Sequence, residues 1–538
     1  MQSSAACKAL LCQEILTEIF DYLSPGRPDE DALPKERLHR REAQKALARA
    51  ARVCRALSGP ALDVLWRVTD SLTALLSIIP SFTLLPSKQL ALTRDVTDAE
   101  WAHFQEYACR VRELYTSSDV QISPSVWIFF ARRCPDGHSL IPRLQRLDAL
   151  DVSSLDPGRI LLLCPTLWHL ALTINHTSHR IAESSPIIDT VMERVQKISV
   201  PNLEGLRVTA ASTDLPFNPD IMPYARLAHL RELEILSSCL FDKDSLQELL
   251  AFPNLRKLTV NPRFLGDMVG DELTPGFRAL LDLKIIGYPT VVSQFLQWTS
   301  PPALESLAIE YADWTLTPDV PDSLPLGGTT KSLRRLQITF ASYLLPSSLL
   351  ELMRPILESD GMTHISITLA HLEMVLPITE TELQTMADAW PNLVEFEIDV
   401  KEIDGGEEVL DYNGRPSPRS LITFAERHPR LVRLVWPFVE TFDASGIRDM
   451  QNAPALGHGL QVFRSCIVRN DGLPKHREFA TFIDRLFPNL DLSDVQYPVV
   501  AKSHYGRQRY KNWHDVEQFL LAIQTGRRSL TESRLTSV

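Results

Sequence analysis

The chain has 538 residues, of which 44% are hydrophobic and 23% are charged, and its formal net charge is -12. This length exceeds what one compact core accommodates, so it predicts several domains or an elongated repeat array. The composition excludes a largely disordered chain, and the acidic balance argues against a protein that works by neutralising nucleic-acid phosphates. The eight cysteines are scattered without a CxxC pair, which is typical of reduced thiols.

No targeting or membrane segment is predicted. The N-terminus lacks the apolar core of a secretory signal. Two apolar stretches, Ser71 to Ser87 and Ile160 to Leu172, contain prolines or fall short of the roughly 20 residues that a membrane helix needs. We therefore expect no membrane partner and a cytoplasmic or nuclear location.

Three helices are predicted before residue 70. The first covers Leu11 to Leu23, where apolar residues recur at helical spacing and form a stripe that needs a partner. The second covers Glu42 to Leu57, and the third runs from Pro60 to Arg67, with its proline suited to a first turn. Residues 24–41, which are charged and rich in proline, predict a surface loop inserted between the first two helices.

These helices carry a specific motif. Residues 11–23 read LxxEILxxIFxxL, followed by VCR at 53–55 and PxLxxLWR at 60–67. The series resembles the F-box, the three-helix motif that docks a receptor onto the Skp adaptor of Skp/cullin/F-box ubiquitin ligases. The resemblance implies an F-box-like domain over residues 1–70, with these residues on or just behind the adaptor-binding surface: Leu11, Ile15, Ile19, Phe20, Val53, Leu65 and Trp66. Alternatively, they form the core of a helical cap on the next domain.

An internal repeat dominates the rest of the chain. After a helical linker or N-terminal cap predicted at 71–140, the pattern LxxLx[LIV] recurs with first positions at Leu203, Leu230, Leu255, Leu280, Leu304 and Leu333. Weaker copies begin at Leu167, Met362, Leu393 and Leu431. The last four positions of each copy alternate between apolar and polar residues, which predicts a strand with one buried face.

Helices are predicted between several of these strands. They cover Asp244 to Phe252, Ser347 to Glu358, Glu380 to Trp390 and Arg419 to Glu426. The first of them contains a capping-box match, with Ser245 as the N-cap and Glu248 three residues later. Strand and helix therefore alternate along the chain.

A unit of one strand and one helix cannot bury its apolar side alone, so neighbouring units must stack. The pattern resembles the leucine-rich-repeat family. The expected fold is α/β, with the three-helix F-box-like module followed by a curved leucine-rich-repeat solenoid that carries a parallel sheet on its concave face. We expect the solenoid to cover residues 141–495, and a C-terminal cap helix and tail to cover 496–538.

Strand alternation also predicts which side chains point away from the core. The following outward positions are the candidate substrate-binding residues: Glu232, Glu234, Lys257, Lys284, Glu310, Arg335, Glu395, Glu397 and Arg433. Their charges have both signs, so no ligand class follows from them.

Catalytic motifs are missing from the sequence. Residues 327–332 lack the glycine that a phosphate-binding loop needs before its lysine, and Cys164, His176 and His179 form an incomplete metal-ligand set. The basic and aromatic segment from Lys502 to Trp513 is more typical of a solvated helix than of a nucleic-acid site. We therefore expect no enzyme activity, no metal, no cofactor and no nucleic-acid partner.

Together these patterns predict a substrate-recognition adaptor. The F-box-like module would bind a Skp-type adaptor and, through it, a cullin, while the repeats would bind an unknown protein substrate for ubiquitination. The alternative is a leucine-rich-repeat scaffold for protein interactions that has no link to ubiquitin.

Overall fold

The computed structural model describes most of the chain. The described residues are 12–27, 34–115, 120–134, 139–152, 157–174, 202–210, 229–241, 243–265, 276–312, 331–340, 348–372, 378–403, 416–436, 444–465, 473–492 and 513–527, with single positions 193, 227, 323, 324, 326 and 529. Contacts within the chain define two compact units, residues 1–239 and 240–538.

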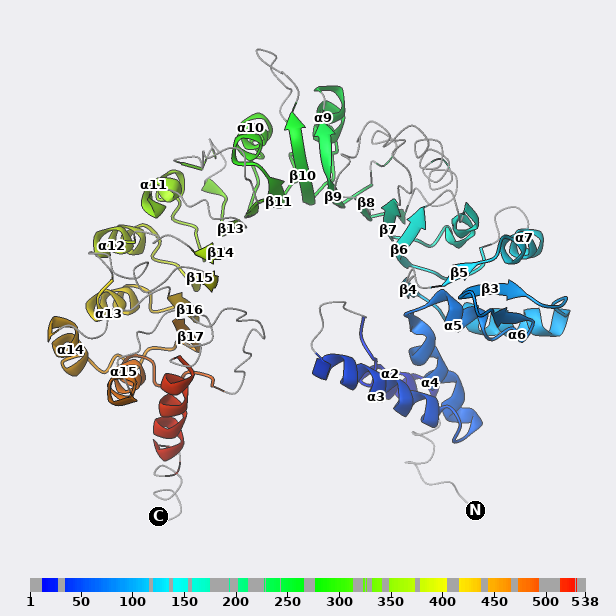
Figure 1. Cartoon of the computed structure of the whole chain (residues 1–538), viewed down its shortest axis with the longest axis horizontal. Helices are drawn as coiled ribbons and strands as arrows, with labels where there is room; N and C mark the ends of the chain where they lie inside the picture. Colours follow the sequence, from blue (N-terminus) through cyan, green and yellow to red (C-terminus); the bar gives the residue numbers. More distant parts are fainter. Residues whose placement is uncertain are drawn as a thin grey trace. The chain divides into compact units, whose positions relative to one another are not determined.

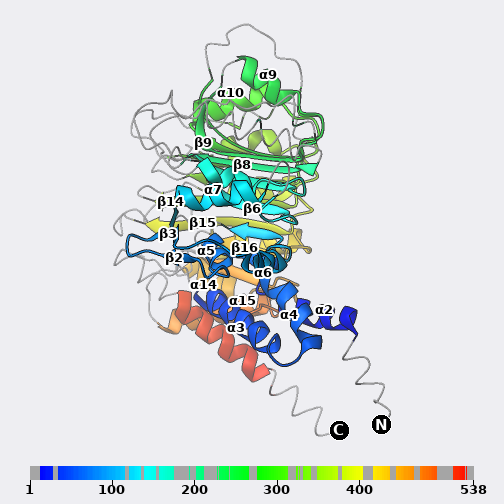
Figure 2. The same ribbon diagram turned by 90° about the vertical axis from the view of Figure 1, so that its right-hand side faces the viewer.

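The first unit begins with three helices: α2 (Gln13–Asp21), α3 (Pro34–Ala50) and α4 (Arg55–Arg67). Both α2 and α3 pack against α4 (Figures 1 and 2). Their shared core consists of Leu16, Phe20, Leu47, Ala61 and Val64. The predicted three-helix module is therefore confirmed.

Several helix boundaries in this module differ from the prediction: α2 ends at Asp21 and not at Leu23, and α3 ends at Ala50 and not at Leu57. Helix α3 starts at Pro34, so residues 34–41 are helical and are not part of a loop. Proline suits a first helical turn, and most residues after it favour a helix. Helix α4 starts at Arg55 and not at Pro60, because Cys54 is extended and its carbonyl accepts the Ser58 N–H at 3.0 Å, which begins the helix there.

Helix α4 continues without a linker into the first strand of a parallel sheet, β1 (Val68–Thr69). The sheet of the first unit has the order β1, β4 (Glu113–Tyr115), β6 (Arg146–Val152), β7 (His169–Ile174), β8 (Gly205–Ala210) and β9 (Glu232–Phe241), whose last two residues fall in the second unit. All neighbours are parallel. In-register pairing aligns the first residues of β4, β6, β7, β8 and β9 in one row across this sheet.

Residues 71–140 are not only helical, which corrects the prediction. They contain α5 (Leu72–Leu76), α6 (Asp98–Ala108), α7 (Pro124–Arg133), strand β4, and a separate sheet of β2 (Phe82–Leu84), β3 (Gln89–Leu92) and β5 (Gln121–Ile122). Strands of two to four residues are too short to show a period in the sequence. The ring of Phe130 on α7 packs edge to face on Phe82 of β2 with centroids 5.6 Å apart, which joins α7 to this small sheet.

The second unit repeats the strand and helix alternation. Its sheet has the order β10 (Lys257–Leu265), β11 (Asp282–Gly287), β12 (Ser306–Tyr311), β13 (Arg335–Phe340), β14 (His364–Leu372), β15 (Glu395–Ile403), β16 (Arg433–Trp436) and β17 (Val462–Ser465), and all neighbours are parallel. Its helices are α9 (Lys243–Leu250), α10 (Pro289–Thr299), α11 (Leu349–Met353), α12 (Glu380–Ala389), α13 (Pro418–Arg427), α14 (Ala444–Gln451), α15 (Leu473–Leu486) and a last helix over residues 513–527; one 3-10 turn, Arg354–Ile356, extends α11. Figure 1 shows β11 to β17 on the inner side of this unit and α10 to α15 outside them.

The repeat pattern predicted the strands closely. Each of the ten recognised copies contains a strand that starts two residues after its first apolar position, as in β11 after Leu280 and β13 after Leu333. In the six central copies all three apolar positions are buried. The predicted leucine-rich-repeat solenoid with a parallel sheet is therefore confirmed.

One predicted cap is wrong. Ser245 lies inside α9 and is buried, so it is not the N-cap residue. Helix α9 begins at Lys243, which places Ser245 at its third residue, on the buried side together with Leu246 and Leu249. A true capping box occurs at α12, where the Thr379 hydroxyl accepts the Glu382 N–H and the Glu382 carboxylate accepts the Thr379 N–H.

Side chains also join consecutive repeats by capping buried carbonyl groups. The indole Nε1 of Trp390 donates to the Ile356 carbonyl at 2.9 Å, and the Ser359 hydroxyl donates to the Leu333 carbonyl at 3.3 Å. His458 accepts a backbone N–H at Nδ1, so its Nε2 carries the proton and donates to a carbonyl one repeat earlier at 2.8 Å. Each of these bonds crosses from one repeat to the next, so together they help to hold neighbouring repeats in register.

Candidate interaction surfaces

Helix α2 has two apolar faces. Leu16 and Phe20 are buried in the core of the module, whereas Ile15 and Ile19 are 40% and 44% exposed. Tyr22 and Leu23 continue the exposed side at the end of the helix. Four apolar side chains on one short helix and the turn after it therefore face solvent, and exposed apolar surface of this kind marks interaction sites.

The other residues implied by the F-box resemblance lie at different depths. Val53, in the turn between α3 and α4, is 70% exposed, while Phe20 is buried and Leu65 packs partly buried against the same core. Trp66 is half-buried and packs edge to face on Tyr107 of α6, with ring centroids 5.3 Å apart. Leu11 lies outside the described residues. The surface thus contains Ile15, Ile19 and Val53, and Trp66 instead joins the module to α6.

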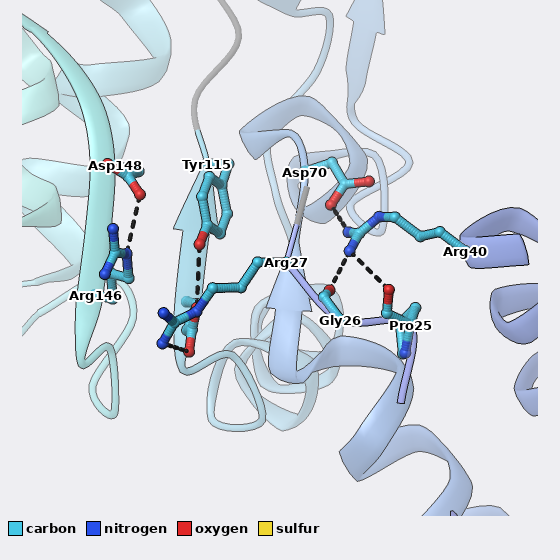
Figure 3. Close-up of polar contacts among 9 residues, drawn as sticks. Pro25, Gly26, Arg27, Arg40, Asp70, Tyr115, Arg146 and Asp148 are labelled. Atoms are coloured by element: carbon cyan, nitrogen blue, oxygen red, sulfur yellow. Dashed lines mark hydrogen bonds and ion pairs between the residues drawn. The ribbon is translucent and has the colours of Figure 1, made fainter. Parts of the chain in front are cut away.

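Residues 24–27, which follow α2 and are here called the strap, connect the three-helix module to the first strands. Arg27 donates from both Nε and a terminal nitrogen to the Glu113 carboxylate on β4, at 2.8 and 3.1 Å (Figure 3). Arg40 of α3 contacts the carbonyl groups of Pro25 and Gly26 and the Asp70 carboxylate. Guanidinium groups that bind carboxylates with two nitrogens define geometry as well as contributing energy.

Next to the strap, polar side chains on the outward face of β4 and β6 pair with one another. Tyr115 donates to Glu113 at 3.3 Å, and Arg146 pairs with Asp148 at 2.9 Å (Figure 3). Burial raises the pKa of Tyr115 to about 12. Burial, followed by the nearby Arg146 charge, lowers the pKa of His169 to about 4, so its imidazole is neutral near pH 7.

The predicted substrate-binding residues lie at outward positions of the strands, but most are paired with one another or with neighbours. In the first unit Glu232 is exposed, and Glu234 pairs with Arg207 at 2.6 Å. In the second unit Lys284 pairs with Glu310 at 3.0 Å, while Lys257 and Arg335 occupy the first outward positions of β10 and β13.

A second group of pairs surrounds β15. Arg433 pairs with Glu397, which also accepts the Ser366 hydroxyl at 3.2 Å. Glu395 lies 4.0 Å from the His364 ring. Sequence reasoning missed Arg207, His364 and Ser366 as members of this surface, although each occupies the same outward register as the predicted residues.

Strands β12 to β14 present small or uncharged side chains between these charged pairs. Register places the following uncharged residues on the outward side: Ser306, Ala308, Gln337, Thr339, Ser366 and Thr368. Glu310, Arg335 and His364 share this side, so uncharged and ionisable side chains are interspersed across the three strands.

The described residues contain no group of three or more His, Cys, Asp or Glu side chains arranged to hold a metal ion. They also contain no helix that is long and apolar enough to cross a bilayer. The candidate metal ligands His176 and His179, the residues 327–330 and the basic segment 502–512 lie outside the described residues.

The chain was compared with protein families, curated protein sequences and solved structures. No family model matches the chain, and no curated protein sequence matches it. Among solved structures, an internalin from Listeria monocytogenes aligns over 74% of this chain and 95% of its own, with 11% sequence identity and a TM-score of 0.33.

Proposed function

We propose that this chain is a substrate-recognition adaptor of a ubiquitin ligase. In this proposal the three-helix module binds a Skp-type adaptor and, through it, a cullin, and the repeat sheet binds a protein substrate. The observation that carries the proposal is the double apolar surface of α2, with Leu16 and Phe20 in the core and Ile15 and Ile19 exposed. A helix that served only as a cap would need the first face alone.

The docking surface has the character of an interface core. Ile15, Ile19 and Leu23 follow one another along α2, and Val53 adds a further exposed aliphatic side chain. A standard interface buries about 800 Å² per partner, and a few apolar anchors supply most of its energy. The exposed side chains of Ile15, Ile19 and Leu23 would provide those anchors.

The substrate would bind the outward face of β11 to β15 in the second unit. Its central row carries the uncharged side chains of Ala308, Gln337 and Ser366. The charged pairs Lys284–Glu310 and Arg433–Glu397 lie on the same face. A partner that breaks one of these pairs must supply a replacement charge, so they discriminate between substrates more than they attract one.

The mechanism requires no chemistry from this chain. Holding a substrate and a ubiquitin-charged partner on one scaffold raises their effective concentration. We propose accordingly that the protein is not an enzyme, needs no cofactor, and acts in the cytoplasm or nucleus. A repeat scaffold without a ubiquitin link is the second candidate, which the repeat fold supports equally well.

The deciding experiment replaces the exposed face of α2 alone. The variant Ile15→Gln/Ile19→Gln should lose binding to a purified Skp adaptor in a pull-down, while its circular dichroism spectrum stays unchanged because both side chains are exposed. Leu84→Gln/Ile128→Gln, which alters two exposed apolar residues outside the module, is the matched control and should bind normally. Trp66 is unsuitable for this test because it packs on Tyr107.

Undiminished binding by the Ile15/Ile19 variant would refute docking through α2. If the unaltered chain fails to bind the adaptor, the scaffold function is supported instead.

A further inference from the structure

Helix α3 carries a concentration of positive charge that the rest of the chain does not share. Residues 34–55 contain eight basic and two acidic side chains, in a chain whose net charge is -12. The face of α3 turned toward the module is fixed by buried Leu47 and by half-buried Arg40, which contacts Asp70. Most of the remaining cations therefore face solvent.

These cations form one continuous line, here called the basic ridge: Arg37, Arg41, Lys45, Arg49 and Arg52. The first four are spaced by four residues, so they lie on one side of the helix about 6 Å apart along its axis. All five are exposed. The ridge thus presents a regular series of charges.

Arg41, Lys45, Arg49 and Arg52 of the ridge differ in their ion pairs from other arginines of the first unit, although Glu42 lies on the same helix three residues before Lys45. Arg67 pairs with Asp21 at 2.8 Å, Arg133 with Asp98 at 2.6 Å, and Arg110 with Asp63. By contrast, no carboxylate among the described residues forms an ion pair with Arg41, Lys45, Arg49 or Arg52. Like charges four residues apart destabilise a helix, so the ridge weakens α3 unless an external group neutralises it.

We propose that the basic ridge binds an acidic segment of a partner protein. A partner helix with carboxylates at every fourth residue would match the spacing of the ridge along its length. Leu38 and Val53, which are 57% and 70% exposed near its two ends, supply aliphatic contacts of the kind found in protein interfaces.

The same observations disfavour a nucleic acid. Proteins that track a single strand combine cations with aromatic side chains that stack on bases. The ridge has aliphatic neighbours instead, and the acidic remainder of the chain repels a polyanion at long range. The aliphatic neighbours of the ridge therefore favour an acidic protein segment over a nucleic acid.

The test uses the full chain and a fluorescent alanine-based peptide of about four helical turns, with glutamate at every fourth position. A peptide of the same composition with scrambled glutamates is the comparison. We expect the spaced peptide to bind more tightly than the scrambled one. Neutralising the ridge in Arg41→Gln/Lys45→Gln/Arg49→Gln/Arg52→Gln should weaken binding about tenfold, since four exposed ion pairs each contribute a small factor.

A matched control removes the same charge from exposed arginines of the second unit, in Arg256→Gln/Arg419→Gln/Arg430→Gln/Arg477→Gln, and should bind the spaced peptide normally. Equal affinity for both peptides, or unchanged binding by the ridge variant, would overturn the proposal. So would tighter ridge-dependent binding of a single-stranded oligonucleotide or of phosphatidylserine vesicles. The Ile15→Gln/Ile19→Gln variant should still bind the peptide, which separates this proposal from docking through α2.

Discussion

Two buried tryptophans provide the sharpest test of how the repeats are held together. Trp390 and Trp436 are both fully buried in the second unit. The Nε1 group of Trp390 donates to the Ile356 carbonyl at 2.9 Å, whereas the Nε1 group of Trp436 has no hydrogen-bond partner among the described residues. Replacing each by phenylalanine removes an indole N–H that is hydrogen-bonded at position 390 and unpaired at position 436.

The expected free energies of unfolding differ accordingly. Trp390→Phe removes one buried hydrogen bond, with a net cost of about 0.5–1.5 kcal/mol, and leaves the Ile356 carbonyl bonded to the Ser359 N–H at 3.0 Å. Trp436→Phe instead removes an unpaired N–H, whose burial costs about 1–3 kcal/mol. Both changes also leave a cavity of similar size, so that contribution largely cancels between them. Trp390→Phe should therefore destabilise the unit by at least about 1.5 kcal/mol more than Trp436→Phe.

Urea unfolding followed by far-ultraviolet circular dichroism measures this difference without relying on tryptophan fluorescence. Hydrogen exchange at the amides of β14 and β15 locates it, because the lost bond joins those neighbouring repeats. Equal destabilisation by the two variants would show that the cap on Ile356 contributes nothing, and the account of inter-repeat capping would fail.

Three further predictions concern the first unit. A methyl group on Gly158 would lie 2.0 Å from the Trp127 ring, so Gly158→Ala should cost about 1–3 kcal/mol by thermal unfolding, while Gly59→Ala in an open part of α4 should be neutral or slightly stabilising. The folded-state pKa of His169 is about 4, below the unfolded value, so stability should fall by at most about 3 kcal/mol as pH drops from about 6.5 toward 4. His169→Gln should flatten that acid titration, and an unchanged profile would contradict it. Arg27→Ala should cost only about 1 kcal/mol because its side chain is half exposed, but it should speed hydrogen exchange in the strap.

Local pattern determined most of what could be predicted. Strand positions follow from alternation within six residues, and every copy of the full LxxLx[LIV] pattern became a strand. The pattern missed two strands in which one position differs: β6 carries a bulge between Leu147 and Leu150, and β17 has Ser465 at the third apolar position of the pattern. Both strands form nevertheless because neighbouring strands supply their hydrogen bonds.

Pairings between distant residues could not be predicted. Arg207 and Glu234 are 27 residues apart, and their contact depends on the exact register between β8 and β9. The contact of Arg27 with Glu113 depends on a segment expected to be a solvated loop. The sequence shows which residues face outward, but the length of each intervening loop decides which of them meet.

Helix α3 was predicted to start at Glu42 and not at Pro34 for a related reason. Charges and prolines over residues 24–41 resemble a loop, yet from Pro34 onward they are helical. The same misreading concealed the basic ridge, since its four-residue spacing has meaning only on a helix.

The direct continuation of α4 into β1 constrains how the two halves of the first unit can be separated. β1 pairs with β4 through Val68 and Thr69, so it is the edge strand of the long sheet and covers β4. A chain that begins at residue 71 would expose the backbone N–H and C=O groups of β4. Exposed edge strands of this kind promote pairing between molecules and precipitation. Point substitutions are therefore safer than truncation for removing the module, and any truncated chain should retain residues from Arg55 onward.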